Sequence, residues 1–195
     1  NTDFHTIMAE IAKIPRKSAK TINLGLFYGM GVGKLSDQLG IEPGEAKSLI
    51  NQYNERVPFV RQLADRVSDH AQKKGRVKTI LGRQCRFDLW EPKSFGAHKA
   101  YPYDKAVEEY GSNIGLKRAG TYKALNRLIQ GSAADQIKKA MVELYKEGVI
   151  PMIQIHDELA ISMENDSKKD KIIEIMENCL DMEIPSKVDL AIGNN

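Results

Sequence analysis

Hydrophobic positions recur at helical spacing through the first half of the chain. Apolar residues fall three and four apart, as they do on the buried face of an amphipathic helix. Pro15, Pro43 and Pro58 stand at the start of such stretches, where the missing proline N–H costs no helical hydrogen bond. Glycines at positions 29, 31 and 33 end the second stretch. The predicted helices cover residues 5–13, 16–28, 34–40, 43–55 and 58–74.

The second half of the chain mixes strand and helix patterns. Residues 75–83 carry β-branched side chains between glycines and predict a β-hairpin. Residues 152–162 predict another hairpin, because two apolar runs flank a polar triplet that places carboxylates at the tip. The other predictions are a loop over 91–104, helix over 105–147 with a break near 111–120, an amphipathic helix over 166–182 and a closing strand over 187–192. The fold class is therefore α+β, with helices dominant.

Composition narrows this picture only slightly. The chain has 195 residues, 42% of them hydrophobic, which is enough to form a buried core. Its net charge of +3 is too small to indicate which kind of partner it binds. Cys85 and Cys179 stand in no metal-binding spacing and are interpreted as free thiols of a reducing compartment, the cytoplasm. No segment has the pattern of a membrane span or secretory signal. The absence of an initiator Met suggests a fragment of a longer protein.

The helix predicted over 16–28 carries a candidate triphosphate site. Arg16, Lys20, Leu24 and Tyr28 are four residues apart and form one stripe about 18 Å long. Arg16 can grip phosphate oxygens in a bidentate manner and Lys20 adds a point charge, while the helix N-terminus itself favours anions. Leu24 and Tyr28 offer apolar and aromatic surface to a sugar and a base. The alternative is an ordinary amphipathic helix with a basic first turn.

A carboxylate turn at residues 156–158 is a second candidate site. Asp157 and Glu158 follow His156 between two apolar strands, and their hard oxygens suit Mg²⁺. A two-metal site needs carboxylates from more than one segment, and no second strand with such a motif is visible. The alternative is a solvated polar turn.

A third polar pattern lies within the helix predicted before this turn. Tyr122, Asn126 and Gln130 repeat every four residues and form a stripe that can contact bases or sugars in a minor groove. The alternative is a helix with a solvated polar face.

Taken in order, these segments resemble the DNA polymerase I family, family A. Residues 16–29 (RKSAKTINLGLFYG) resemble its motif B, and residues 155–158 (IHDE) resemble its motif C. Residues 79–83 (TILGR) resemble the link from fingers to palm, and residues 130–135 (QGSAAD) the entry to the palm helix. The short gap between His5 and Arg16 is closest to the phage-type branch.

The resemblance implies a DNA-directed DNA polymerase, a nucleotidyltransferase of DNA replication that uses Mg²⁺, primer-template DNA and a dNTP. It implies a fingers subdomain over residues 1–90, with nucleotide-binding helix 16–28, and part of an antiparallel-sheet palm over 91–195. The implied nucleotide-binding residues are His5, Arg16, Lys20, Leu24 and Tyr28, with Lys20 also a candidate general acid for pyrophosphate. The implied metal ligands are Asp157 and Glu158, and the implied DNA contacts are Arg83, Asn126, Gln130 and His156.

Three departures from the family pattern bear on function. Leu24 stands where the family usually has Phe or Tyr, and Tyr122 stands where many relatives have Arg. Motif A, which supplies the other metal-binding aspartate, is expected upstream of Asn1, so the isolated chain is predicted to be nearly inactive without that partner region. Two other functions stay open: a single-subunit RNA polymerase, and a non-catalytic DNA-binding remnant or one half of a split polymerase.

Overall fold

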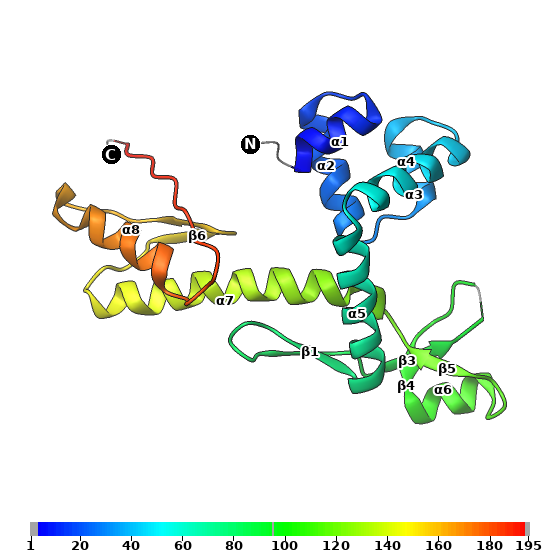
Figure 1. The fold of residues 1–195 in the computed structure, drawn as a ribbon. Coiled ribbons are helices and arrows are strands. Elements are labelled where there is room, and N and C mark those ends of the chain that lie inside the picture. The colour runs from blue at the N-terminus through cyan, green and yellow to red at the C-terminus, as the bar shows by residue number, and fades with distance from the viewer. Residues whose placement is uncertain (1–3, 95, 194–195) are drawn as a thin grey trace. The chain divides into compact units, whose positions relative to one another are not determined.

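The computed structural model describes residues 4–94 and 96–193, which fold into two compact units (Figure 1). The N-terminal unit consists of the described residues of Asn1–Lys78 together with Gln84–Leu128. The C-terminal unit consists of Thr79–Arg83 together with the described residues of Ile129–Asn195. The backbone therefore passes between the units three times. This division does not test the boundary between fingers and palm predicted at residue 90, which stays a prediction.

The N-terminal unit opens with helices at the places where the apolar spacing predicts them. Pro43 and Pro58 occupy the first helical turn of α4 and α5, as expected. Helices α3 and α5 end at Gly40 and Gly75, whose φ angles of 65° and 69° are left-handed and suit glycine. The helices are α1 Phe4–Ala12, α2 Arg16–Phe27, α3 Val32–Leu39, α4 Pro43–Arg56 and α5 Pro58–Lys74.

One hydrophobic core joins these helices. Helix α2 contributes Ala19 and Ile22, which are almost completely buried against a cluster that includes Met8 of α1. The rest of the buried cluster consists of Leu35, Ala46, Tyr53, Val57 and Val60. Because this packing uses one side of α2, the stripe that begins at Arg16 is left on the other side, at the surface.

The same unit contains two small antiparallel sheets. Strand β1 (Arg76–Lys78) pairs with β2 (Gln84–Arg86), with Val77 opposite Cys85. A hairpin is therefore present, but its second strand begins after the predicted range of 75–83, whose last five residues form the tip instead. The second sheet has the order β4-β3-β5. Its strands are β3 Leu89–Pro92, β4 Tyr101–Pro102 and β5 Leu116–Arg118. A core cluster of Ala71, Val77, Phe87 and Ala124 packs α5 against the first sheet.

The loop predicted over 91–104 is only partly correct. Trp90 pairs with Tyr101, so the polypeptide returns as a strand, and its prolines stand at strand ends. The guanidinium carbon of Arg118 lies 4.5 Å from the centroid of the Trp90 ring, which strengthens the pairing of β3 with β5. The helix predicted over 105–147 is broken where expected, into α6 Tyr103–Tyr110, a 3₁₀ turn Thr121–Lys123 and α7 Ala124–Lys146.

The C-terminal unit combines most of α7 with a hairpin and a short helix. Strand β6 (Ile153–Ile155) pairs with β7 (Glu158–Ala160), which confirms the predicted hairpin. Leu144, Val149 and Ile172 form the buried cluster, and Leu159 of β7 packs against it. The unit also contains a 3₁₀ turn Asp166–Lys168 and α8 Lys169–Asn178. None of the described helices is both long enough and apolar enough to span a membrane.

The closing strand predicted over 187–192 is wrong. No strand is present there within the described residues. A strand needs a neighbour for its backbone groups, whereas the N–H of Val188 donates to the carboxylate of Glu177 at 3.1 Å. The helix predicted over 166–182 is also shorter, because α8 ends at Asn178.

Candidate active site

The stripe on α2 lies at the surface as predicted. Arg16, Lys20 and Leu24 are exposed, Leu24 to 43%, while Ala19 and Ile22 face the core. The first turn of α2 contains no acidic residue, and Arg16 stands where the helix dipole disfavours a cation. A cation held at that position costs local stability, and a bound anion would compensate for it. The geometry therefore suits a phosphate group.

His5 reaches α2 from the preceding helix. The side-chain amide of Asn23 donates to Nδ1 of His5 at 3.0 Å, and Asn23 is only 5% exposed. With Nδ1 accepting this bond, the neutral ring carries its proton on Nε2, which is then a donor for another group. This contact holds His5 of α1 against α2, the helix that carries Arg16 and Lys20, whereas its phosphate contact stays a prediction.

Tyr28 lies just beyond the last turn of α2. Its N–H donates to the carbonyl of Leu24 at 3.1 Å, and its ring meets Phe27 edge to face at 5.3 Å. Gly29 follows with a φ of 86°, which turns the chain away from the helix. Tyr28 therefore ends the stripe as a cap residue, outside the helix predicted to include it.

Gly25, in the middle of the stripe, leaves room for the side chain of Met30. An added Cβ on Gly25 would lie 2.0 Å from Cε of Met30. The N–H of Met30 also donates to the carbonyl of Gly25 at 2.7 Å. In this structure the space beside Gly25 is filled by Met30, and a base pair at that place would require the flexible Met30 side chain to move.

The carboxylate turn has the predicted form. His156 and Asp157 are the two central residues between paired Ile155 and Glu158. His156 has a φ of 55°, a left-handed conformation that His tolerates better than bulky residues do. Gln154 supports the turn by donating from its side chain to the carbonyl of His156 at 3.0 Å. Asp157 and Glu158 are both exposed at the tip.

These carboxylates do not form a complete metal site by themselves. Within residues 4–94 and 96–193, no group of three or more His, Cys, Asp or Glu side chains is placed to hold a metal ion. Asp157 and Glu158 offer hard oxygen ligands suited to Mg²⁺, but a two-metal centre needs further carboxylates. The turn therefore fits part of a magnesium site.

The polar face before the turn is divided between two elements. Asn126 and Gln130 lie one turn apart on α7, half-buried and exposed respectively. Tyr122 belongs to the preceding 3₁₀ turn and is 66% exposed, with Nζ of Lys123 5.3 Å from its ring centroid. The predicted stripe is thus helical for Asn126 and Gln130 only.

Arg83 is held in an ion pair that the sequence did not reveal. Its Nε donates to Oδ1 of Asp135 at 2.9 Å and its Nη2 donates to the carbonyl of Gly131 at 2.8 Å. Asp135 is only 5% exposed. Burial acts to raise the pKa of Asp135, but hydrogen bonds from Thr79 and Arg83, the charge of Arg83 and a backbone bond at Leu81 leave its pKa below the usual value.

Small residues on α7 allow this loop to approach closely. An added Cβ on Gly131 would lie 2.7 Å from Cγ2 of Thr79. The hydroxyl of Ser132 accepts a hydrogen bond from the N–H of Ile80 at 3.0 Å. Gly131, Ser132 and Asp135 therefore form a seat for the loop Thr79–Arg83, and the small residues before Asp135 were its signal in the sequence.

Comparison with known proteins decides the family. The model of "DNA polymerase family A" matches residues 2–195. The chain belongs to DNA polymerase family A. It is 34% identical, over 229 aligned positions, to a DNA-directed DNA polymerase of Pseudomonas phage M6, covering 100% of this chain and 31% of the relative. It is 30% identical to the thermostable DNA polymerase I of Thermus filiformis, covering 92% of this chain and 20% of the relative.

The fold agrees with a solved family A structure. The polymerase domain of Pol1 from M. smegmatis, in complex with DNA primer-template and dNTP, matches with a TM-score of 0.70 and 29% identity. The match covers 93% of this chain and 32% of that chain. The chain thus spans about a third or less of the length of these family A proteins. The predicted family and the α+β fold class are confirmed.

Proposed function

We propose that this chain is the fingers and part of the palm of a template-directed DNA polymerase. The polymerase of which it is part adds deoxynucleotides to a primer 3′-hydroxyl by two-metal phosphoryl transfer during replication in a bacterial or phage-infected cell. The observation that carries the proposal is the exposed Arg16–Lys20–Leu24 stripe, whose helix also binds His5 through Asn23. Family A membership, and a neighbour solved with primer-template and dNTP, support it.

The incoming dNTP lies along α2 in this proposal. Arg16 binds the triphosphate through two guanidinium N–H groups, and Nε2–H of His5 donates to the same phosphates. Lys20 neutralises the departing pyrophosphate and donates a proton to it as general acid. Leu24 contacts the sugar, and Tyr28 stacks near the template base. Leu24 has no ring, so we expect this polymerase to discriminate between deoxyribose and ribose differently from relatives that have Phe or Tyr at this position.

The carboxylate turn holds metal in this proposal. Asp157 would be the principal ligand and Glu158 a secondary one, because their oxygens suit Mg²⁺. Bound Mg²⁺ supplies activation of the 3′-hydroxyl and charge neutralisation on the leaving phosphates. His156 lies at the primer end, and Asn126 and Gln130 contact the minor groove. The position of Tyr122 lacks the Arg of many relatives, so a primer contact is weakened there.

In this proposal Arg83 contacts the DNA backbone while its ion pair with Asp135 remains intact. Its side chain is 47% exposed although it binds Asp135, so part of the guanidinium remains accessible. An Arg that is oriented by a carboxylate loses less conformational entropy when it binds a phosphate.

A further segment completes the palm in this proposal. Strands β6 and β7 form a two-stranded sheet within the described residues, so backbone groups at its edges are available to another strand. Ile153 and Ile155 on β6 are each 56% exposed, which favours burial beneath added structure. We infer that the upstream region carrying motif A adds this structure together with the second metal-binding aspartate.

Primer extension tests the proposal. The purified chain alone, the chain mixed with the upstream motif A region, and the polymerase containing both are compared with dNTPs and with rNTPs. We expect extension by dNTPs only when motif A is present, and its loss in Asp157→Asn. Extension by the chain alone would overturn the inferred incomplete site. Preference for rNTPs would identify an RNA polymerase, and DNA binding without synthesis by the joined regions would identify a non-catalytic remnant.

A further inference from the structure

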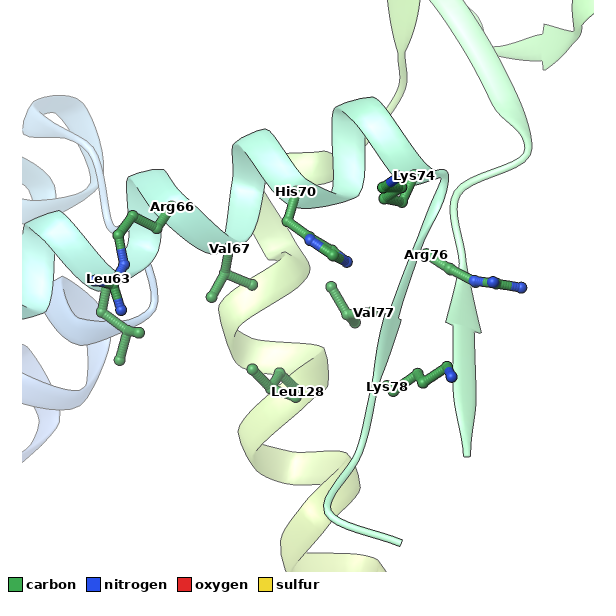
Figure 2. A pocket seen from close by; sticks show the side chains of 9 residues that line it. All are labelled: Leu63, Arg66, Val67, His70, Lys74, Arg76, Val77, Lys78 and Leu128. Carbon is green, nitrogen blue, oxygen red and sulfur yellow. The ribbon is translucent and has the colours of Figure 1, made fainter. Parts of the chain in front are cut away.

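A pocket of about 620 Å³ lies in the N-terminal unit and is lined by none of the residues assigned above (Figure 2). One side is formed by α5, where Val67, His70 and Lys74 follow each other at helical spacing along one face. The other side is formed by β1 and by Leu128 of α7. A volume of this size is within the range of ligand pockets, which is roughly 300–1,000 Å³.

The edge of the pocket is cationic. Figure 2 shows Lys74, Arg76 and Lys78 at the end of α5 and along β1, and Arg66 farther back along α5. No acidic side chain lines the pocket. Within the part of the chain that the structure describes, none of these four cations lies in an ion pair, whereas Arg61 on α5 pairs with Asp65. The pocket therefore carries a concentrated positive potential that an anionic ligand can neutralise.

The floor of the pocket is aliphatic. Val67, Val77 and Leu128 lie in the middle of the view in Figure 2, and Leu63 extends this surface. Val77 is only 3% exposed and belongs to the core cluster, so the apolar surface open to a ligand comes mainly from the half-buried Leu63, Val67 and Leu128. An aliphatic floor stabilises a ligand by burying apolar surface, which phosphate and sugar groups do not provide.

The lining favours a peptide over a nucleic acid. Single-stranded nucleic acid is usually held by a basic groove together with aromatic rings on which bases stack. The imidazole of His70 is the one aromatic ring among the lining residues, so the lining offers a stacking surface to a single base at most. An acidic peptide matches both surfaces of the pocket. Its carboxylates pair with the cations at the edge, and one apolar side chain packs on the aliphatic floor.

We propose that this pocket binds an acidic segment of a partner protein, which inserts one apolar side chain between α5 and β1. Its Asp and Glu side chains pair with the cations at the edge. The proposal goes beyond DNA synthesis and does not depend on it, because all of the lining residues lie in the N-terminal unit and none belongs to the proposed active site.

Fluorescence anisotropy with the full chain tests the proposal. The probe is a fluorescein-labelled peptide rich in Asp and Glu with a single central Leu. We expect saturable binding that weakens as NaCl is added, because the contacts at the edge are electrostatic. Replacing the Leu of the peptide by Ser should weaken binding about tenfold. Methyl NMR signals of Val67 and Val77 should shift during the same titration, a readout that needs no variant.

Charge reversals provide the matched comparison. Lys74→Glu with Lys78→Glu should weaken binding about tenfold or more. The control, Lys73→Glu with Lys47→Glu, changes the net charge by the same amount at exposed positions that do not line the pocket. Its effect should be about twofold at most.

Three results would overturn the proposal. The first is no saturable binding of the acidic peptide to the wild-type chain. The second is an equal loss of affinity in the pocket variant and the control variant, which would indicate attraction by net charge alone. The third is displacement of the peptide by an oligothymidylate that binds more tightly and loses more affinity in the pocket variant, which would make the pocket a nucleic-acid site.

Discussion

Arg83 and Asp135 are 52 positions apart in the sequence and are joined by a hydrogen bond of 2.9 Å between Nε and Oδ1. The carboxylate is buried, whereas the Arg83 side chain is 47% exposed. The pair fixes the loop Thr79–Arg83 on α7 within the C-terminal unit. Stability measurements can therefore test this seat separately from any enzymatic activity.

Replacing Asp135 by Asn should lower the free energy of unfolding by about 1–3 kcal/mol, because the guanidinium of Arg83 loses its charged acceptor. Urea denaturation followed by circular dichroism measures the change. Asp37→Asn is the control, since Asp37 is exposed on α3 and should change stability by less than about 0.5 kcal/mol. Equal losses in both variants would show that the pair does not stabilise the fold.

The contribution of Asp135 should also depend on pH. Its pKa in the folded chain lies below the usual value, so the folded state binds fewer protons than the unfolded state does as acid is added. Its stabilisation is complete above the unfolded pKa, about 4, and is lost as pH falls through the folded pKa. The stability difference between wild type and Asp135→Asn should therefore shrink below about pH 4. A difference that grows in acid would contradict this assignment.

Gly131→Ala tests the close approach of the loop to α7. The added Cβ would lie 2.7 Å from Cγ2 of Thr79, and this overlap should cost about 1–3 kcal/mol despite the better helix propensity of Ala. Thr79→Ser removes the methyl group and keeps the hydroxyl, so adding it should recover part of the loss. Gly44→Ala is the control, because nothing lies near its added Cβ. A cost in Gly131→Ala that Thr79→Ser leaves unchanged would rule out this contact.

Lys20→Ala should reduce kcat/KM for dNTP incorporation by about a hundredfold in the polymerase that also contains motif A, because the leaving pyrophosphate loses its cation. Single-nucleotide incorporation kinetics measure the effect. Lys47→Ala, an exposed change on α4, should have little effect. Similar rates for Lys20→Ala and wild type would exclude Lys20 from the reaction.

His156→Gly tests the turn of the carboxylate hairpin. Gly removes the steric cost of a φ of 55° and should raise stability by up to about 1 kcal/mol, whereas Val should lower it by about as much. Thermal unfolding of the two variants gives the comparison. A lower stability for Gly than for Val would contradict the left-handed turn.

Local patterns predicted the elements and the surface stripe. The α2 stripe and the hairpin at residues 156–158 depend on nearby residues, so spacing and turn chemistry were sufficient to find them. The pairing of Trp90 with Tyr101 and the seat of Arg83 on Asp135 depend on residues distant in sequence. A single sequence contains no direct record of such contacts.

The same limit explains the wrong strand at residues 187–192. Alternating apolar residues show that a segment can pair, but they do not supply a partner. Val188 instead donates to Glu177 at the end of α8. The pocket beside α5 was missed for a related reason, since its cations come from a helix and a strand and form no motif in the sequence.

The hairpin between β1 and β2 limits how this chain can be divided. Its strands belong to the N-terminal unit and its tip, Thr79–Arg83, belongs to the C-terminal unit. No single cut therefore separates two self-contained pieces: division after Leu128 would leave α7 without the loop that covers Gly131. Swapping either unit with that of a relative would require the exchange of three junctions together, so the two units are expected to be inherited as one block.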